Sequence, residues 1–223
     1  MEFLSQTYVA LRGPTGAPQT ASETIRRLCD RLSPATLLAD RRAAVLSLKG
    51  LTKDWKADVG DSALPGLLEV LYNDAEVDSD IGKAVLETLN ALCDAEEGSA
   101  KDKELGVKFT DLVLATEKPV HSLVALLKDN SFYTRLSTLQ FLLTLLRTRR
   151  QHVQAYFLTA PEGPASILAT LEDKREIIRN GASTMIILLL YCTNEMCRGN
   201  YHVTVAPLAK PRYPEDPCVR RRI

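Results

Sequence analysis

The stretch "SLVALLKDNSFYTRLSTLQFLLTLL" (122–146) decides the fold, because its pattern returns in "SILATLEDKREIIRNGASTMIILLL" (166–190). In each copy an apolar helix end is followed by an acidic turn and then by an amphipathic helix. A constant shift of 44 residues superimposes the two copies, with Leu127 on Leu171, Asp129 on Asp173 and Arg135 on Arg179. The segment is therefore one unit of an internal repeat.

The repeat extends toward the N-terminus, with a looser copy in residues 67–89 and a partial copy in residues 37–48. A period in the low forties built from helices is typical of armadillo and HEAT proteins. One such unit cannot bury its apolar face alone, so neighbouring units stack to complete the core. We therefore predict an all-α fold, an armadillo/HEAT-like right-handed superhelix of helical repeats with an irregular C-terminal tail. The alternative is an irregular helical bundle.

Capping residues and apolar spacing place the first helices. Ser22 is a predicted N-cap for a helix over 22–32, where apolar side chains recur at helical spacing. Ser33 as N-cap and Pro34 at the first helical position predict a second helix over 33–51. Further helices are predicted over 61–74 and 79–94, and a polar loop over 94–104 follows them.

Composition indicates a soluble globular protein. The chain has 223 residues, of which 45% are hydrophobic and 25% charged, and its 28 basic and 28 acidic residues give no net charge. This balance provides no whole-chain attraction to nucleic acid or to an anionic membrane. Five irregularly spaced cysteines favour reduced thiols in a cytosolic protein. The N-terminus does not resemble a signal peptide, and the apolar run 185–191 is too short to span a membrane, which takes about 20 residues.

No catalytic or metal-binding pattern is found. His121, His152 and His202 lie in unrelated contexts, without an Asp or Cys partner at a recognisable spacing. A zinc site formed by Cys192, Cys197, His202 and Cys218 would match no common finger or ribbon. We therefore predict that the protein is not an enzyme and has no catalytic, cofactor-binding or metal-binding residues and no cofactor. Its partner-binding residues are left unassigned.

Three charged features are compatible with binding. The basic cluster "RTRRQH" (147–152) could meet phosphate or an acidic partner, although it is more simply a solvated helix end, and "DAEEG" (94–98) is most simply a solvated loop. The recurring pairs Asp129/Arg135 and Asp173/Arg179 form either a binding ladder or, more simply, turn caps and contacts within each repeat. A helical solenoid without a reactive site usually binds proteins along an extended surface. A scaffold should show an open groove or apolar patch, whereas an enzyme should show one deep pocket with convergent polar groups.

Specific residues also resemble a known family. "TASETIRRLCDRLSPATLLADRRAAVLSLKGLTKDWKADVG" (20–60) resembles the start of the general vesicular transport factor family, the Uso-type tethers of endoplasmic-reticulum-to-Golgi traffic. The later stretch from "LVALLKDNSFYTRL" to "REIIRN" (123–180) matches the same family's head. The resemblance covers roughly residues 1–180, and the opening residues "MEFLSQTYVALRGPTGAPQTA" resemble fungal members.

This resemblance implies an armadillo-like head that tethers vesicles by protein–protein binding. In the family the head precedes a dimeric coiled coil, acts with Rab-type small GTPases, promotes SNARE assembly and works with Golgi tethers. It implies a cytoplasmic protein that is peripheral on Golgi and transport-vesicle membranes, binds no nucleic acid and is a homodimer at full length. The alternative is an unrelated helical-repeat adaptor or a scaffold that regulates GTPases.

The glycine- and proline-rich start of the chain and the extent of the resemblance together predict three segments. Residues 1–20 form a flexible lead-in, residues 21–180 a partial vesicle-tether head, and residues 181–223 a tail that does not follow the family pattern and whose first part is apolar enough to form a helix. Four of the eleven prolines fall within residues 207–217 of this tail, which has no helical repeat. A retained intron or a reading-frame change would produce such a tail, and a short isoform is the alternative. The chain then ends without its next repeat, so we expect it to be marginally stable or prone to aggregate.

Overall fold

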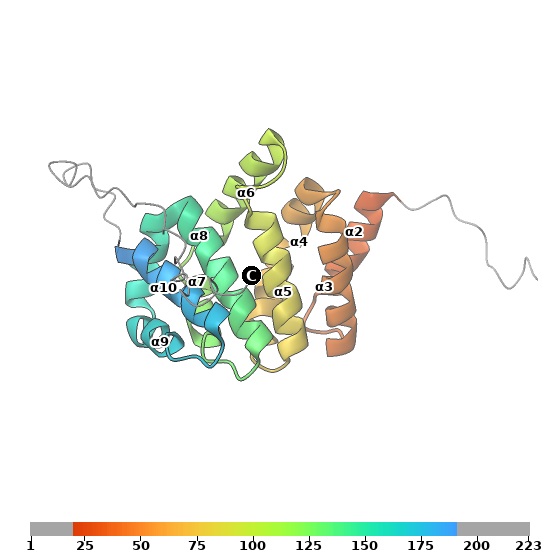
Figure 1. Ribbon diagram of the computed structural model, residues 1–223. Coiled ribbons are helices and arrows are strands. Elements are labelled where there is room, and N and C mark those ends of the chain that lie inside the picture. The colour runs from red at the N-terminus through yellow and green to blue at the C-terminus, as the bar shows by residue number, and fades with distance from the viewer. Residues whose placement is uncertain (1–19, 191–223) are drawn as a thin grey trace, which may run out of the picture. The chain divides into compact units, whose positions relative to one another are not determined.

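The computed structural model describes residues 20–190, and this part of the chain consists of helices joined by short turns (Figure 1). The helices are α2 (Ala21–Asp30), α3 (Leu38–Thr52), α4 (Lys56–Asn73), α5 (Ser79–Cys93), α6 (Ala100–Val113), α7 (Lys118–Leu126), α8 (Phe132–Thr159), α9 (Gly163–Thr170) and α10 (Glu176–Leu190). No strand is present in these residues, as the absence of alternating apolar patterns predicted. None of these helices is long and apolar enough to cross a lipid bilayer.

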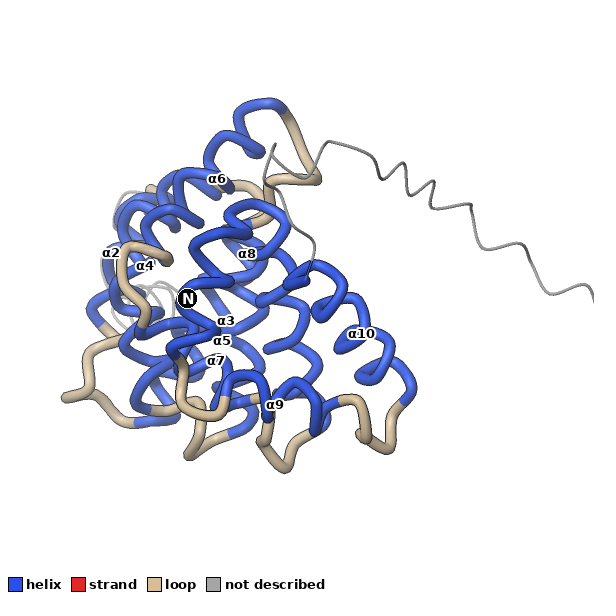
Figure 2. Tube along the Cα trace, turned by 90° about the vertical axis from the view of Figure 1, so that its left-hand side faces the viewer, coloured by secondary structure: helices blue, strands red, loops and turns tan. Residues whose placement is uncertain are grey.

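The helices form two layers. One layer consists of α3, α5, α8 and α10 in this order, and the other of α2, α4, α7 and α9, each helix packing against its neighbours in its layer (Figure 1). α6 lies outside this pairing and packs against α4, α5 and α8. Figure 2 views the stack from the end formed by α9 and α10. Successive units therefore bury one another's apolar faces, as a solenoid requires.

The predicted repeat is visible as structure. α8 begins 44 residues before α10, at Phe132 and Glu176, and α7 and α9 hold the same place before them. α8 is itself divided, because Arg149 has non-helical angles (φ −136°, ψ 58°). Its second part therefore corresponds to α6, and the last two units each contain three helices.

One continuous core runs through the described units. Leu67 and Leu71 of α4, Leu86 and Leu89 of α5 and Phe141 of α8 are essentially inaccessible to solvent. α5 is buried on most of its circumference, because helices lie on several sides of it. This core fixes the spacing of the surface residues described below.

Two predicted N-caps are wrong. The N-cap of α2 is Thr20, whose hydroxyl accepts a hydrogen bond from the Glu23 amide at 3.3 Å, and not Ser22. α3 begins at Leu38 and not after Ser33, because residues 31–37 form turns. The Arg41 guanidinium donates to the carbonyl oxygens of this turn and holds it in place of a first helical turn.

The predicted boundary at Asn180 falls inside α10. Ile178 before it and Ala182 and Met185 after it are all fully buried. Gly181 lies so close to α8 that an added Cβ would be 2.4 Å from a methyl carbon of Leu139. Residues 181–190 thus continue the repeat packing, and the compact unit ends at Leu190. The predicted flexible lead-in, apart from Thr20, and the remainder of the predicted tail lie outside the described residues.

Candidate protein-binding surfaces

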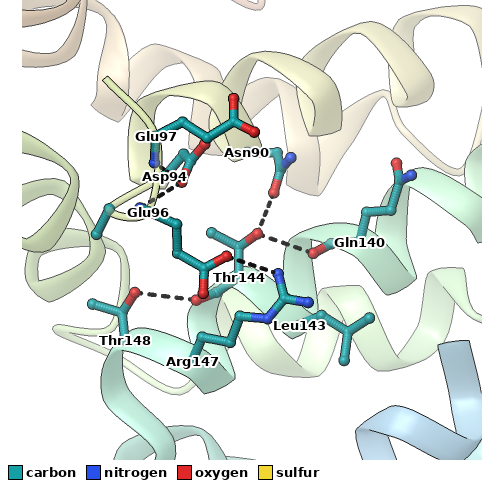
Figure 3. Close-up of a pocket in the computed structure, with 10 residues that line it drawn as sticks. Asn90, Asp94, Glu96, Glu97, Gln140, Leu143, Thr144, Arg147 and Thr148 are labelled. Carbon is teal, nitrogen blue, oxygen red and sulfur yellow. Dashed lines mark hydrogen bonds and ion pairs between the residues drawn. The ribbon is translucent and has the colours of Figure 1, made fainter. Parts of the chain in front are cut away.

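A polar pocket of about 370 Å³ opens between the end of α5, the loop after it and the first part of α8 (Figure 3). Its wall combines carboxylates, amides, hydroxyls and one guanidinium, from Asn90, Asp94, Glu96, Glu97, Gln140, Thr144, Arg147 and Thr148. The Thr144 hydroxyl donates to Asn90 Oδ1 at 2.7 Å, so the amide nitrogen of Asn90 stays available to a ligand. Such a wall can bind the polar groups of an extended peptide, but an open site does not exclude water.

The loop that forms this pocket is held from three sides. Asp94 Oδ1 accepts hydrogen bonds from the amides of Glu96 at 2.8 Å and Glu97 at 3.4 Å, which closes a local turn. Lys56 Nζ donates to the Asp94 carbonyl at 2.7 Å, and burial lowers the pKa of this amine. α6 approaches closely at Gly106, where an added Cβ would be 2.2 Å from the same carbonyl oxygen.

The structure brings the predicted acidic loop and basic cluster together. Arg147 pairs with Glu96 at 3.3 Å across the pocket (Figure 3), and Arg149 pairs with Asp111 of α6 at 2.8 Å. The hydrogen bond from Arg149 holds the pKa of the Asp111 carboxyl below its usual value. The predicted solvated loop and solvated helix end therefore meet in the structure, and both arginines form ion pairs that remain largely exposed to water.

A second surface is an apolar groove of about 530 Å³ formed by the second part of α8, α9 and α10. Its wall is almost entirely hydrocarbon, from Phe157, Leu158, Pro164, Ile167, Leu168, Ile186, Leu189 and Leu190. Leu158 and Leu190 are 73% and 77% exposed, although large apolar side chains are normally buried. A contiguous exposed apolar patch of this kind is typical of surfaces that bind proteins, ligands or membranes and of surfaces that aggregate. The open groove expected of a scaffold is thus present.

The arginines of the repeat join neighbouring units. Arg135 is the fourth residue of α8; its Nη1 donates to the Asp129 carbonyl at 2.9 Å and its Nε to the Asp173 carboxylate at 2.7 Å. The predicted contact within the repeat is therefore correct, but it uses the aspartate's carbonyl. The Asp173 carboxylate instead binds Arg135 of the preceding unit, whereas the Asp129 carboxylate accepts a hydrogen bond from the Ser131 amide.

The same arrangement occurs at the N-terminal end. Arg41, the fourth residue of α3, donates to the carbonyl of Thr36 in its own turn and binds the Asp74 carboxylate through two bonds of 2.7 Å. The Arg41 and Asp74 side chains are 12% and 9% exposed, so the pair is largely shielded from water. The internal repeat does not show which carboxylate each arginine binds. The only clue in the sequence is the spacing of 33 to 38 residues between each arginine and its aspartate.

The remaining candidate residues are not brought together. His121 Nε2 lies 3.2 Å from the Tyr156 carbonyl, linking α7 to α8, whereas His152 is exposed on α8. Within residues 20–190 no three metal-ligating side chains gather. Cys93 is buried, and desolvation raises the pKa of its thiol to about 12. The suggested zinc ligands lie outside the described residues.

Stacked helical units with an open polar pocket and an apolar end groove define an armadillo-like repeat protein. The chain is 35% identical over 175 residues to human General vesicular transport factor p115, covering 75% of the chain and 18% of that protein. It is 29% identical over 180 residues to Intracellular protein transport protein uso1 of Schizosaccharomyces pombe, covering 81% of the chain and 17% of that protein. A crystal structure of Uso1-1 superimposes with a TM-score of 0.70 at 28% identity, covering 76% of the chain and 29% of that structure.

The chain belongs to the general vesicular transport factor family. The predicted fold class, an all-α superhelix of armadillo-like repeats, is confirmed by the helices and by the Uso1-1 structure. The chain spans less than a fifth of the length of the human and fission-yeast relatives. No established family profile matches it.

Proposed function

We propose that the protein acts in endoplasmic-reticulum-to-Golgi transport as the repeat-containing head of a vesicle tether. The observation that supports this most strongly is the similarity to General vesicular transport factor p115 across three quarters of the chain. The described surface fits a role in binding. It offers a polar pocket and an apolar groove, both open to solvent and both formed between stacked helices.

The proposed mechanism is protein binding without catalysis. The polar pocket presents the Asn90 amide and the carboxylates of Glu96 and Glu97 beside a paired guanidinium, which suits the backbone and basic side chains of a peptide. The partners we propose are a Rab-type small GTPase, SNAREs and Golgi tethers. The proposed location is the cytoplasmic face of Golgi and transport-vesicle membranes, with peripheral attachment, and we propose that the full-length protein is a homodimer.

The test is a pull-down with the purified 223-residue chain. Golgi-cycle Rab GTPases, loaded with a GTP analogue or with GDP, and cis-Golgi SNAREs are offered separately, and an endocytic Rab serves as the matched control. We expect retention of at least one Golgi-cycle protein and no retention of the control. Equal retention of both Rabs, or of neither Rab nor any SNARE, would leave an unrelated helical-repeat adaptor as the better description.

The polar pocket can be tested in the same assay. Glu97→Lys reverses a charge on the pocket wall, and Glu23→Lys reverses one on α2, outside the pocket. We expect Glu97→Lys to weaken retention several-fold while Glu23→Lys leaves it unchanged. Equal retention of the two variants would assign partner binding to another surface.

A further inference from the structure

The polar pocket between α5 and α8 carries more negative than positive charge. Three carboxylates line it, from Asp94, Glu96 and Glu97, against the single guanidinium of Arg147. The Lys56 amine donates to the Asp94 carbonyl at 2.7 Å and offsets one of these charges. At least one negative charge is therefore left over, and a concave site with charge of one sign concentrates ions of the opposite sign.

Glu97 is the carboxylate without a cation. In Figure 3 the Glu96 carboxylate points toward Arg147, whereas the Glu97 carboxylate points away from it. Within residues 20–190 Glu97 forms no ion pair, and it is the backbone amide of Glu97, not its side chain, that bonds to Asp94 Oδ1 at 3.4 Å. The Glu97 carboxylate is thus available to a cation that enters the pocket.

Asn90 adds an oriented hydrogen-bond donor to the same pocket. The Thr144 hydroxyl donates to Asn90 Oδ1 at 2.7 Å, which fixes the orientation of the amide group. The Asn90 amide nitrogen has no acceptor in the part of the chain that the structure describes, and its two N–H groups can bind a peptide carbonyl. A ligand that carries both a cation and a backbone carbonyl can therefore use the loop and the helix wall together.

Arg147 holds one of the positions that a ligand cation would take. Its Nη1 lies 3.3 Å from Glu96 Oε2, and the two side chains are 46% and 64% exposed. An ion pair this open to water contributes little to stability. A ligand cation that also gains Glu97 and Asn90 can therefore displace Arg147 from Glu96, so that the chain's own guanidinium acts as a weak internal competitor.

We propose that the polar pocket binds an arginine side chain of an extended peptide, which replaces Arg147 at Glu96, engages Glu97 and directs a neighbouring backbone carbonyl to the Asn90 amide. A guanidinium suits the site because its planar fork can bind two carboxylates at once. The inference rests on the protein-binding role proposed above, and it names the chemical group that the pocket recognises in a partner.

The probe is a short glycine–serine peptide, blocked at both ends, with a single central arginine. Its matched control carries citrulline, the neutral isostere of arginine, at the same position. The peptides are titrated into the ¹⁵N-labelled 223-residue chain and followed by NMR. We expect the arginine peptide to shift the Asn90 side-chain amide and the backbone amides of residues 94–97, with a Kd at least about tenfold lower than that of the citrulline peptide.

Variants of the chain separate this site from general charge effects. We expect Glu97→Gln to weaken binding of the arginine peptide at least about fivefold, because the uncompensated carboxylate is lost. We expect Arg147→Gln to tighten binding about two- to fivefold, because the internal competitor is removed. Lys108→Gln is the matched control, since it removes the same charge from a side chain that is 50% exposed on α6, outside the pocket. It should leave the Kd within about 1.5-fold of the unmodified value.

Three results would overturn the proposal. The arginine and citrulline peptides bind equally; or the shifted resonances lie away from the pocket; or Arg147→Gln tightens binding no more than Lys108→Gln does, which would assign the attraction to the charge of the whole chain. These outcomes are separate from those of the pull-down. A chain that binds the arginine peptide as expected but retains no Golgi-cycle protein keeps the site and loses the tether role, and a chain that retains such a protein without preferring arginine does the reverse.

Discussion

At the scale of single residues, the arginine–aspartate pairs act as joints between units. Arg135 and Asp173 are 17% and 9% exposed, and each also bonds to the backbone of a turn. By contrast, Lys108 and Asp61, which join α6 to α4, are 50% and 53% exposed. Ion pairs contribute little when water surrounds them, but removing one partner of a shielded pair leaves a charge uncompensated.

Arg135→Gln should therefore lower the free energy of unfolding by about 2 kcal/mol. The matched change Lys108→Gln should cost less than about 1 kcal/mol, since its pair is solvated. Urea denaturation followed by circular dichroism measures both values. Equal losses from the two changes would show that shielding does not distinguish the pairs.

The same joint predicts a dependence on pH. Burial alone would raise the pKa of the Asp173 carboxyl, but the Arg175 amide and the Arg135 guanidinium bind its charged form and hold the pKa below its usual value. A carboxylate with a lowered pKa stabilises the folded state above its unfolded pKa of about 3.9, and this contribution is lost as the pH falls through the folded pKa. Asp173→Asn should thus lower the melting temperature most at pH 6 to 7, and the difference should shrink below about pH 4. A difference that stays constant from pH 7 to pH 2 would contradict this origin.

At the scale of elements, the repeat was predictable from the sequence, whereas the break in α8 and the polar pocket were not. The shift of 44 residues was read directly from the apolar spacing around Leu127 and Leu171, and it matches the starts of α8 and α10. The break at Arg149 could not be predicted, because the sequence there is compatible with one long helix, and the ion pair of Arg149 with Asp111 of α6 joins residues that are remote in the sequence. The polar pocket was hidden for the same reason. Its two walls, loop 94–97 and α8, are remote in the sequence, so neither pattern indicated the other.

The contact between α6 and the pocket loop gives the prediction at this scale. Gly106 lies against the Asp94 carbonyl, and a methyl group there would be 2.2 Å from the oxygen, which is backbone and cannot rotate away. Gly106→Ala should therefore destabilise the protein by about 1–3 kcal/mol. Gly50→Ala in α3 is the control, because a Cβ there meets nothing within 4 Å and should add about 0.5–1 kcal/mol of helix stability. Thermal melts would contradict the packing if both changes were stabilising.

At the scale of the described unit, five of the eleven exposed large apolar side chains within residues 20–190 lie on the last unit. These are Leu158, Leu168, Ile177, Ile187 and Leu190, and three of them line the apolar groove. The other six are spread over the preceding helices and turns, Val77 among them in the turn between α4 and α5. The groove that α8, α9 and α10 form is almost entirely apolar and open, and an exposed apolar patch promotes aggregation. If the protein aggregates as predicted, we expect the contacts to form at the apolar groove of α8, α9 and α10.

Placing charge on this end should therefore slow aggregation without loss of fold. Leu168→Glu combined with Leu190→Glu puts two carboxylates on the groove wall, where both side chains are more than half exposed and have little packing to lose. We expect light scattering during slow warming to begin at a higher temperature than in the wild type, with an unchanged circular dichroism spectrum. Val77→Glu is the matched control, since Val77 is 78% exposed and Leu190 is 77% exposed, yet Val77 belongs to no patch. If Val77→Glu delays scattering as much as the double change, net charge is the cause and the α9–α10 face is not the aggregating surface.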